Sequence, residues 1–480
     1  MRNLLPTDES LYPDDLALND SRLRELDQRP YTDAGQGEAF ADLWADVLRY
    51  VPGIGWMIWT GNRWQLDDKE AVVQYAIMAA RARQEAVLAR HIPQGEEHQQ
   101  NALQRNKERD AKWARSAEST RGINATLQMA RTVPHLIEDH GNFDADPMLL
   151  GVSNGVVDLR TGHLRPSTQA DLISKTCGIP FFPDAQAPLW EQFLQEIFNG
   201  DEHLVAYIQR AVGYSFTSST QEQCFFLCYG TGANGKSTFL NMLKAVGGDY
   251  VTNTPFSTFE HRQQSSTGQE IVELRGRRIV LSNETNEGTR LNEARIKAIT
   301  GGDLITGRYL YARQSITFQP TFHLWLAANH KPAISGGDEG IWRRVRLIPF
   351  TRTFRGHQQD KLLDSKLRNE LPGILAWAVR GALAWQQQGL NEPQSVQDAT
   401  QSYRDESDII GQFLSERTIS GPELQAPSGQ LYSIYERWTT ENGLFTLSSV
   451  KFARDLEERG YIKKRNARVR FWCGLGILDD

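Results

Sequence analysis

Long apolar runs are absent from this 480-residue sequence. No stretch reaches the roughly 18 consecutive apolar residues of a membrane-spanning helix, so we expect no membrane segment. The opening residues, MRNLLPTDESLYPDD, lack the basic start and the apolar core of a secretory signal. We therefore expect a flexible leader over residues 1–30 and a cytoplasmic protein.

Cysteine is scarce, and basic residues are not in excess over acidic ones. The four cysteines, Cys177, Cys224, Cys228 and Cys473, lack the tight pairing of a zinc site, and they predict buried thiols in a reducing compartment. The chain has 53 basic and 59 acidic residues, a net charge of −6. Any nucleic-acid contact must therefore come from local basic clusters.

The succession of sequence patterns predicts several domains. Residues 31–145 contain a hairpin pattern, WMIWTGNRW, and long helical patterns, which together predict a mainly helical N-terminal domain. Residues 146–215 combine a small β unit, GVSNGVVDLRTGHLRP, with helices, and form a predicted pre-motor domain.

Apolar strands alternate with helices from residue 216 to residue 395, which is typical of an α/β fold. Strands are expected at CFFLCYG, RRIVLSN, FHLWLAAN and RRVRLIPF. Residues 406–480 predict helices followed by a hairpin, YIKKRNARVRFWCG, in the order of a winged-helix domain.

Residues 230–238 match the phosphate-binding P-loop pattern G-x-x-x-x-G-K-[ST] at every fixed position. The loop follows a predicted strand and opens a helix, whose positive dipole end favours an anion. Lys236 would bind the β- and γ-phosphates of ATP, and Ser237 would bind Mg²⁺. A glycine-rich turn without a ligand is the alternative. The expected nucleotide-binding residues are Gly230, Thr231, Gly232, Ala233, Asn234, Gly235, Lys236, Ser237 and Thr238.

Polar residues near the other strands complete the predicted site. Glu284 directly follows the strand RRIVLSN and is the first candidate for ordering Mg²⁺ or polarising the attacking water, with Glu287 as the second. Asn329 ends the strand FHLWLAAN, where it would hold the water or the γ-phosphate. Arg343 or Arg344 would reach the nucleotide of a neighbouring subunit as an arginine finger. The alternatives are solvated loop acids, a capping asparagine and surface salt bridges.

In these motifs the chain resembles superfamily 3 helicases of the AAA+ class, specifically the phage- and plasmid-type primase–helicase group. GTGANGKST, VLSNETNEG and LWLAANHKP resemble the group's motifs in order and spacing. The segment IKAITGGDLITGRYLYARQSITFQP resembles its additional motif and its DNA-gripping hairpin. The second motif departs from the group, because Asn283-Glu284-Thr285 stands where many members have two adjacent acids.

The resemblance implies an AAA+ motor domain in a ring, expected to be a hexamer, with ATP and Mg²⁺ bound between subunits. The residues acting within one subunit would be Lys236, Ser237, Glu284 and Asn329. Arg343 or Arg344 would act from the next subunit, and Lys297 is a weaker candidate for a γ-phosphate or inter-subunit contact. The resemblance also implies movement on single-stranded DNA, for a phage, plasmid or integrated element in a bacterial host.

Two segments are the expected DNA contacts. Tyr309, Tyr311 and Arg313 alternate along one strand of the first hairpin, where rings can stack on bases and arginine can meet phosphate. The basic cluster of the C-terminal hairpin is suited to duplex phosphates. The alternatives are an ordinary amphipathic hairpin and a solvated or protein-docking basic face. The cluster consists of Lys463, Lys464, Arg465, Arg468 and Arg470.

Asp144 and Asp146 form a D-x-D pair of the kind that binds metals in polymerase-like primases. No convincing strand precedes them, so we interpret both as structural and expect a separate primase as partner. The preferred function is an ATP-dependent replicative DNA helicase. The alternatives are an AAA+ protein that remodels or loads other proteins, and an origin-binding initiator that uses ATP as an assembly switch.

Overall fold

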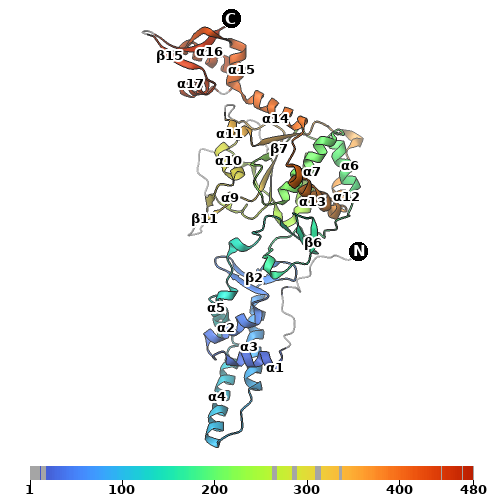
Figure 1. The fold of residues 1–480 in the computed structure, drawn as a ribbon, viewed down its shortest axis with the longest axis vertical. Coiled ribbons are helices and arrows are strands. Elements are labelled where there is room, and N and C mark those ends of the chain that lie inside the picture. The colour runs from blue at the N-terminus through green and yellow to red at the C-terminus, as the bar shows by residue number, and fades with distance from the viewer. Residues whose placement is uncertain are drawn as a thin grey trace. The chain divides into compact units, whose positions relative to one another are not determined.

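The computed structural model describes residues 11, 18–261, 268–283, 289–308, 315–334, 338–444, 446–466 and 469–478, without the side chain of His357. The chain forms two compact units, residues 1–183 and residues 184–480 (Figure 1). Within the described ranges, no helix combines the length and the apolar character that crossing a bilayer requires.

The first unit is built around helices that bury small and aromatic residues. Phe40, Trp44 and Trp56 share one buried cluster with a run of alanines on the helix α3. Alanine is the strongest helix former, and its small side chain leaves room for the rings. The predicted helical character of this region is confirmed. Its helices are α1 (Asp20–Gln28), α2 (Asp33–Trp44), α3 (Val72–Ala89), α4 (Glu97–Ser116) and α5 (Thr120–Ala130).

Helix α1 lies within the segment expected to be a flexible leader. Leu23 and Leu26 of this helix are buried against alanines of α2 and α3. The guanidinium of the buried Arg83 donates to the carbonyl oxygens of Leu26, Arg29 and Pro30, which fixes the chain that leaves the helix. The expected leader is therefore wrong for residues 20–28, because two leucines and a distant arginine hold them.

Two small antiparallel sheets complete the first unit. In the first sheet, Trp59 lies opposite Trp64 at the predicted hairpin. The second sheet occupies the segment predicted as a small β unit. The strands are β1 (Leu48–Val51), β2 (Gly55–Trp59), β3 (Trp64–Leu66), β4 (Leu149–Val152), β5 (Gly155–Asp158) and β6 (His163–Arg165).

A five-stranded parallel sheet with the order β13-β7-β12-β9-β8 is the centre of the second unit. Four of these strands are the ones that the apolar runs predict. The edge strand β8 was not predicted, because three residues are too few to show the alternating pattern of a strand. The structure is thus of the mixed α/β class. The strands are β7 (Phe225–Tyr229), β8 (Val251–Asn253), β9 (Ile279–Asn283), β12 (His323–Ala328) and β13 (Val345–Pro349).

Alternation along β7 separates two cores on opposite faces of this sheet. Phe226 stacks on Trp325 with 4.3 Å between ring centroids, and Trp325 in turn contacts Phe239 of α8. Phe225 and Leu227 face the other way, into a cluster formed with α9, α10 and α11. Helices therefore cover both faces. They are α6 (Pro188–Ile197), α7 (Glu202–Phe216), α8 (Lys236–Gly247), α9 (Gln269–Val272), α10 (Glu293–Gly301), α11 (Glu339–Trp342), α12 (Leu363–Arg368) and α13 (Leu371–Gln388).

Helices α6 and α7 pack within the second unit, around the parallel sheet. Trp190 of α6 contacts the rings of Phe239 on α8 and Trp377 on α13. The segment expected as one pre-motor domain, residues 146–215, is therefore divided. Its strands belong to the first compact unit, and its helices belong to the second.

The cysteines follow the predicted pattern of buried thiols. Cys177, Cys224 and Cys228 are buried and free, and Cys473 is half-buried. Burial raises the pKa of Cys224 and of Cys228 to about 12. Within the described residues, no group of three or more histidine, cysteine or acidic side chains is arranged to hold a metal.

The chain ends in a small domain that follows the connecting helix α14 (Gln394–Ser407). Three helices and a three-stranded antiparallel sheet, β14-β16-β15, enclose a core of Phe413, Tyr435, Phe452 and Trp472. The predicted helices and hairpin are confirmed, and β14 is an additional strand. The elements are α15 (Ile409–Arg417), β14 (Thr418–Pro427), α16 (Ser428–Glu441), α17 (Ser449–Glu458), β15 (Ile462–Arg465) and β16 (Arg470–Ile477).

Two glycines allow α7 and α13 to approach closely. A Cβ at Gly213 would collide with the backbone of Gly381 and Ala382, and a Cβ at Gly381 would collide with Gln209 O. We expect Gly213→Ala and Gly381→Ala each to destabilise the protein by about 1–3 kcal/mol, the usual cost of overpacking. Gly429→Ala is the control, since nothing lies within 4 Å of its added methyl group. Urea unfolding measures all three, and equal stability of the three variants would contradict this packing.

Candidate nucleotide-binding site

The carboxyl ends of the parallel strands bring three predicted motifs to one edge of the sheet. Tyr229, the last residue of β7, pairs with Ala328 of β12, and Ala327 pairs with Asn283 at the end of β9. The amide of Gly230 then donates to Ala328 O at 3.3 Å. In open parallel sheets, ligands bind outside the carboxyl ends of the strands. This edge is therefore the place to seek a ligand.

The loop between β7 and α8 depends on glycine at its end. Gly235 has φ of +87°, and a Cβ there would lie 2.5 Å from Ile197 Cγ2. The buried Asn234 holds the loop from inside, since its amide donates to Phe350 O and its oxygen accepts from the Lys236 amide. The amide of Phe354 donates to Ala233 O at 2.8 Å. The loop conformation is thus fixed by neighbours on both sides.

The same loop presents unused donors. In the described part of the chain, no hydrogen bond is found for the backbone N–H groups of residues 231–235. These donors lead into the first turn of α8, where the helix dipole is positive. Successive free N–H groups at a helix start form a binding site for an anion.

Lys236 places a cation beside these donors. Its side chain is 5% exposed, and its ammonium group donates to Gly230 O and to Asn329 Oδ1, the latter at 3.1 Å. No carboxylate among the described residues pairs with it, and burial lowers its pKa. A buried cation with only neutral partners is costly, so this position favours an anionic ligand.

The metal-binding candidates are only partly described. Ser237, the second residue of α8, is exposed, so its hydroxyl is open to a ligand at the start of the helix. Residues 284–288 lie outside the described residues, and this range includes Glu284 and Glu287. The hydroxyl of Ser237 and a nearby phosphate are ligands that suit Mg²⁺.

Arg343 and Arg344 lie away from the loop of their own chain. They precede β13, which runs parallel to β7, and Arg344 O accepts from the amide of Phe225 at the start of β7. The loop follows the other end of β7, about 13 Å along the strand at ~3.3 Å per residue. Neither arginine therefore joins Lys236 and Asn329.

The two arginines also differ from one another. Arg344 is buried, and its guanidinium donates to Thr300 Oγ1 at 3.0 Å and to Gly340 O at 2.6 Å. Burial, with the neighbouring Arg343, lowers its pKa. Arg343 is exposed, and its side chain has no hydrogen bond or ion pair within the described part of the chain. Lys297 pairs with Asp338 near these residues and not with the loop.

Lys331 is a residue near the loop that sequence reasoning missed. Its ammonium lies 5.2 Å from the centroid of the Tyr229 ring and 5.6 Å from that of Tyr403, and it pairs with Glu406 of α14 at 2.7 Å. The hydroxyl of Tyr403 donates to Pro332 O. A lysine two positions after Asn329 was the available signal. Lys331 connects the ends of β7 and β12 to the helix that leads to the C-terminal domain.

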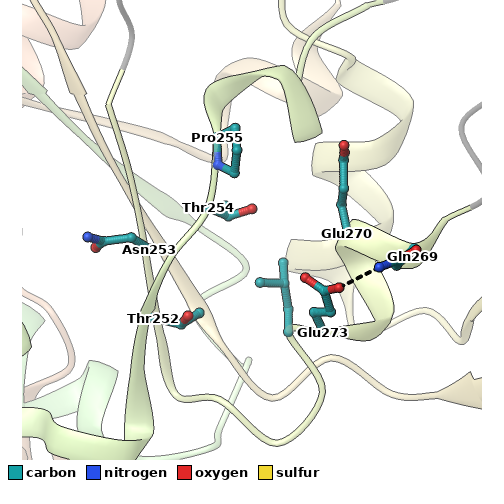
Figure 2. A pocket seen from close by; sticks show the side chains of 8 residues that line it. Thr252, Asn253, Thr254, Pro255, Gln269, Glu270 and Glu273 are labelled. Carbon is teal, nitrogen blue, oxygen red and sulfur yellow. Dashed lines mark hydrogen bonds between the residues drawn. The ribbon is translucent and has the colours of Figure 1, made fainter. Parts of the chain in front are cut away.

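A polar hollow of about 390 Å³ lies at the end of β8 (Figure 2). Thr252, Asn253 and Thr254 line one side. On the other side are Glu270 of α9 and Glu273, the residue that directly follows this helix. Glu273 accepts from the side chain of Gln269 at 2.9 Å, and Glu270 accepts from the hydroxyl of Thr258. The charged side chains that line this hollow are both acidic, so they disfavour a phosphate there. The free donors of residues 231–235 remain the better anion site.

The predicted DNA-contact residues are described in part. Tyr309, Tyr311 and Arg313 lie outside the described residues, and the strands on either side, β10 (Ile305–Gly307) and β11 (Ile316–Phe318), pair in an antiparallel arrangement. Arg468 also lies outside them. The remaining basic residues of the C-terminal hairpin are all exposed. They are Lys463, Lys464, Arg465 and Arg470.

Known protein families and individual proteins match this chain in sequence. A family model described as "D5 N terminal like" matches residues 37–199, and a family of unknown function, DUF5906, matches residues 228–344. The chain is 28% identical over 301 residues to "Putative helicase L207/L206" of Acanthamoeba polyphaga mimivirus. It is 24% identical over 336 residues to "Putative primase C962R" of African swine fever virus (isolate Pig/Kenya/KEN-50/1950). The D5-like match and the viral helicase and primase relatives support a member of the phage-type primase–helicase family.

The chain spans about a third of the length of these relatives. The matches cover 58% of this chain and 31% of the mimivirus protein, and 62% of this chain and 34% of the African swine fever virus protein. Among solved structures, "The apo structure of NrS-1 C terminal region (305-718)" matches 62% of this chain and 78% of that chain. The two structures superpose with a TM-score of 0.42 at 12% sequence identity.

Asp144 and Asp146, the D-x-D pair, both have structural partners. Asp144 has φ of +52° and accepts from Ser174 and from Lys175 Nζ, the latter at 2.9 Å. Burial alone would raise its pKa, but the Lys175 ammonium and the Ser174 hydroxyl hold it below its ordinary value. Asp146 pairs with Arg160 at 2.7 Å. These contacts agree with the interpretation of both acids as structural.

The difference in burial between Arg343 and Arg344 predicts that replacing each of them changes stability by a different amount. Arg344→Ala removes two buried hydrogen bonds and leaves Thr300 and Gly340 O without this partner, so we expect a loss of about 1–3 kcal/mol in the free energy of unfolding. Arg343→Ala changes an exposed side chain and should stay within about 0.5 kcal/mol of the parent. Chemical denaturation of both variants measures this difference, and similar losses would contradict it.

Proposed function

We propose that this protein is an ATP-driven DNA helicase of replication, with an AAA+ motor built on the parallel sheet. The observation that carries the proposal is the buried ammonium of Lys236, which has no carboxylate partner in the described chain and lies beside free N–H donors. A polyphosphate supplies the negative charge that this arrangement lacks. The P-loop pattern of residues 230–238 and the viral helicase and primase relatives support the same conclusion.

The proposed role of each site residue follows from its position in the chain and in the fold. Lys236 turns from Gly230 O to the β- and γ-phosphates, which releases Asn329 Oδ1. Asn329 then orients the attacking water or the γ-phosphate, and Glu284 accepts the proton of that water. Ser237 holds Mg²⁺, which would neutralise charge on the phosphates. Lys331 keeps the loop after Asn329 in place through Glu406 and is a positioning residue.

The proposed assembly is a ring, expected to be a hexamer. Arg343 is exposed, and it lies at the opposite end of β7 from the loop of its own chain. It can therefore meet a nucleotide only across a contact between subunits, where it would stabilise the charge of the transition state. Arg344 is the weaker candidate, because its donors are used inside the fold. Tyr309, Tyr311 and Arg313 are the proposed contacts to single-stranded DNA in the channel.

Replacing Lys236 tests nucleotide binding in a protein that still folds. We expect Lys236→Met to remain folded, since an apolar chain of similar volume takes the place of the buried cation. The parent should gain about 2.7 kcal/mol of stability at 100 times the Kd of Mg–ATP, and the variant should gain nothing. Thermal unfolding with and without Mg–ATP measures this. Lys244→Ala, at an exposed position on the same helix, is the control and should respond like the parent.

Mixing two inactive variants tests the contact between subunits. Arg343→Ala should bind ATP and hydrolyse it at least 10³-fold more slowly, the usual order of an arginine-finger effect. Lys236→Met should not bind ATP, but it still carries Arg343. In a mixture, an intact loop can face an intact arginine, so ATPase activity should reappear. A mixture as inactive as its components would overturn the assignment of Arg343.

A further inference from the structure

The C-terminal domain has two candidate segments for binding nucleic acid, with different surroundings. One is the helix α17, which a helix-turn-helix arrangement would place in a DNA groove. The other is the hairpin formed by β15 and β16. Their charges and partners decide which of them is suited to nucleic acid.

The basic residues of α17 are few and largely neutralised. The helix contains two basic and three acidic residues over Ser449–Glu458. Arg454 pairs with Glu458 at 3.0 Å within the helix. Arg459, just beyond it, pairs with Asp455 and with Asp408, which caps α15. Among the described residues, Lys451 is the only basic residue of this helix without an acidic partner, so the helix surface has little attraction for phosphate.

The hairpin has the opposite character. All four residues of β15 are exposed, and three of them are basic. Lys463, Lys464, Arg465 and Arg470 have no acidic partner within the described residues. Arg465 also lies directly opposite Arg470 in the strand register. Like charges in directly opposed positions destabilise a sheet, and an anion between them would remove that cost.

The cations lie on both faces of the ribbon. Residues that are paired across strands share a face, so Arg465 and Arg470 lie on the face of Lys463 and Trp472, where the Lys463 ammonium is 5.1 Å from the ring centroid. Lys464 lies on the other face, opposite Phe471. Strand β14 also pairs with β16 as far as Phe471, so the hairpin is two-stranded only at its tip, around Arg465 and Arg470. A two-stranded ribbon fits the major groove of duplex DNA. Cations on both faces of such a ribbon can meet the phosphates on both sides of a groove.

We propose that the β15–β16 hairpin, and not helix α17, is the duplex-binding element of the C-terminal domain, and that it holds phosphates without selecting a base sequence. This inference rests on the proposed action on DNA. It refines that function, because contacts to phosphate position a protein on a duplex and carry no sequence information. It also disfavours an origin-specific role for this domain.

Two double variants that each remove two positive charges test the proposal. Lys464→Ala/Arg465→Ala changes the hairpin, and Lys451→Ala/Arg454→Ala changes α17. Binding of the full chain to a short blunt-ended duplex is measured by fluorescence anisotropy without nucleotide, over a range of salt concentrations. A second duplex has the same composition in shuffled order.

We expect the hairpin variant to bind both duplexes on the order of 10- to 100-fold more weakly, with a log–log salt slope reduced by about 1.8, or ~0.9 for each lost contact. The α17 variant should bind like the parent. Loss of binding in the α17 variant, or loss for only one of the two duplexes, would overturn the proposal. Parent-like duplex binding by the hairpin variant would also overturn it, and would point instead to an acidic protein partner for the hairpin.

Basal ATPase activity and thermal unfolding distinguish this proposal from the proposed function. Basal ATPase activity without DNA should be unchanged in the hairpin variant, since its residues are exposed and distant in sequence from the loop at residues 230–238. Its thermal stability should be unchanged or slightly higher, since Arg465→Ala removes a like-charge pair. A parent protein without ATPase activity would remove the proposed function and leave the duplex-binding result standing. Normal ATPase activity with an unaltered salt slope in the hairpin variant would remove only the present inference.

Discussion

A buried ammonium group without a carboxylate partner is the constraint on which the centre of the second unit depends. Lys236 Nζ donates to Gly230 O and to Asn329 Oδ1, so it joins the loops after two neighbouring strands. The parallel register of β7 and β12 places those loops side by side. Because neutral oxygens compensate only part of the cost of burying a cation, the fold leaves a site that an anion completes.

The parallel sheet also keeps apart the two cations of the proposed hydrolysis site. The lysine loop follows the carboxyl end of β7, whereas Arg343 and Arg344 lie beside its amino end. A single subunit therefore cannot bring Arg343 to its own loop. In the proposed motor, assembly of subunits becomes part of the active site, and the neighbouring Arg344 is used to hold α10 and α11 against the sheet.

Helix α14 connects this site to the C-terminal domain through aromatic and ionic contacts. Tyr403 packs edge-on against Trp342 at 5.0 Å and donates to Pro332 O, while Glu406 pairs with Lys331. A shift of the loop after Asn329 would therefore be transmitted to α14 through these contacts. That path joins the proposed site of ATP hydrolysis to the domain whose exposed hairpin carries unpaired positive charge.

The sequence by itself determined the local elements and the chemistry of the loop. Apolar runs marked four strands of the sheet, and the P-loop spacing marked the residues that bring free donors and Lys236 to a helix start. It did not reveal β8, which is too short to have a period, or the burial of α1, which depends on Arg83 far along the chain. Only the tertiary structure separated Arg343 from Arg344 and the charged hairpin from the neutralised helix α17. Those distinctions depend on burial and on partners distant in sequence, such as Thr300 for Arg344 and Asp408 for Arg459, which no local pattern records.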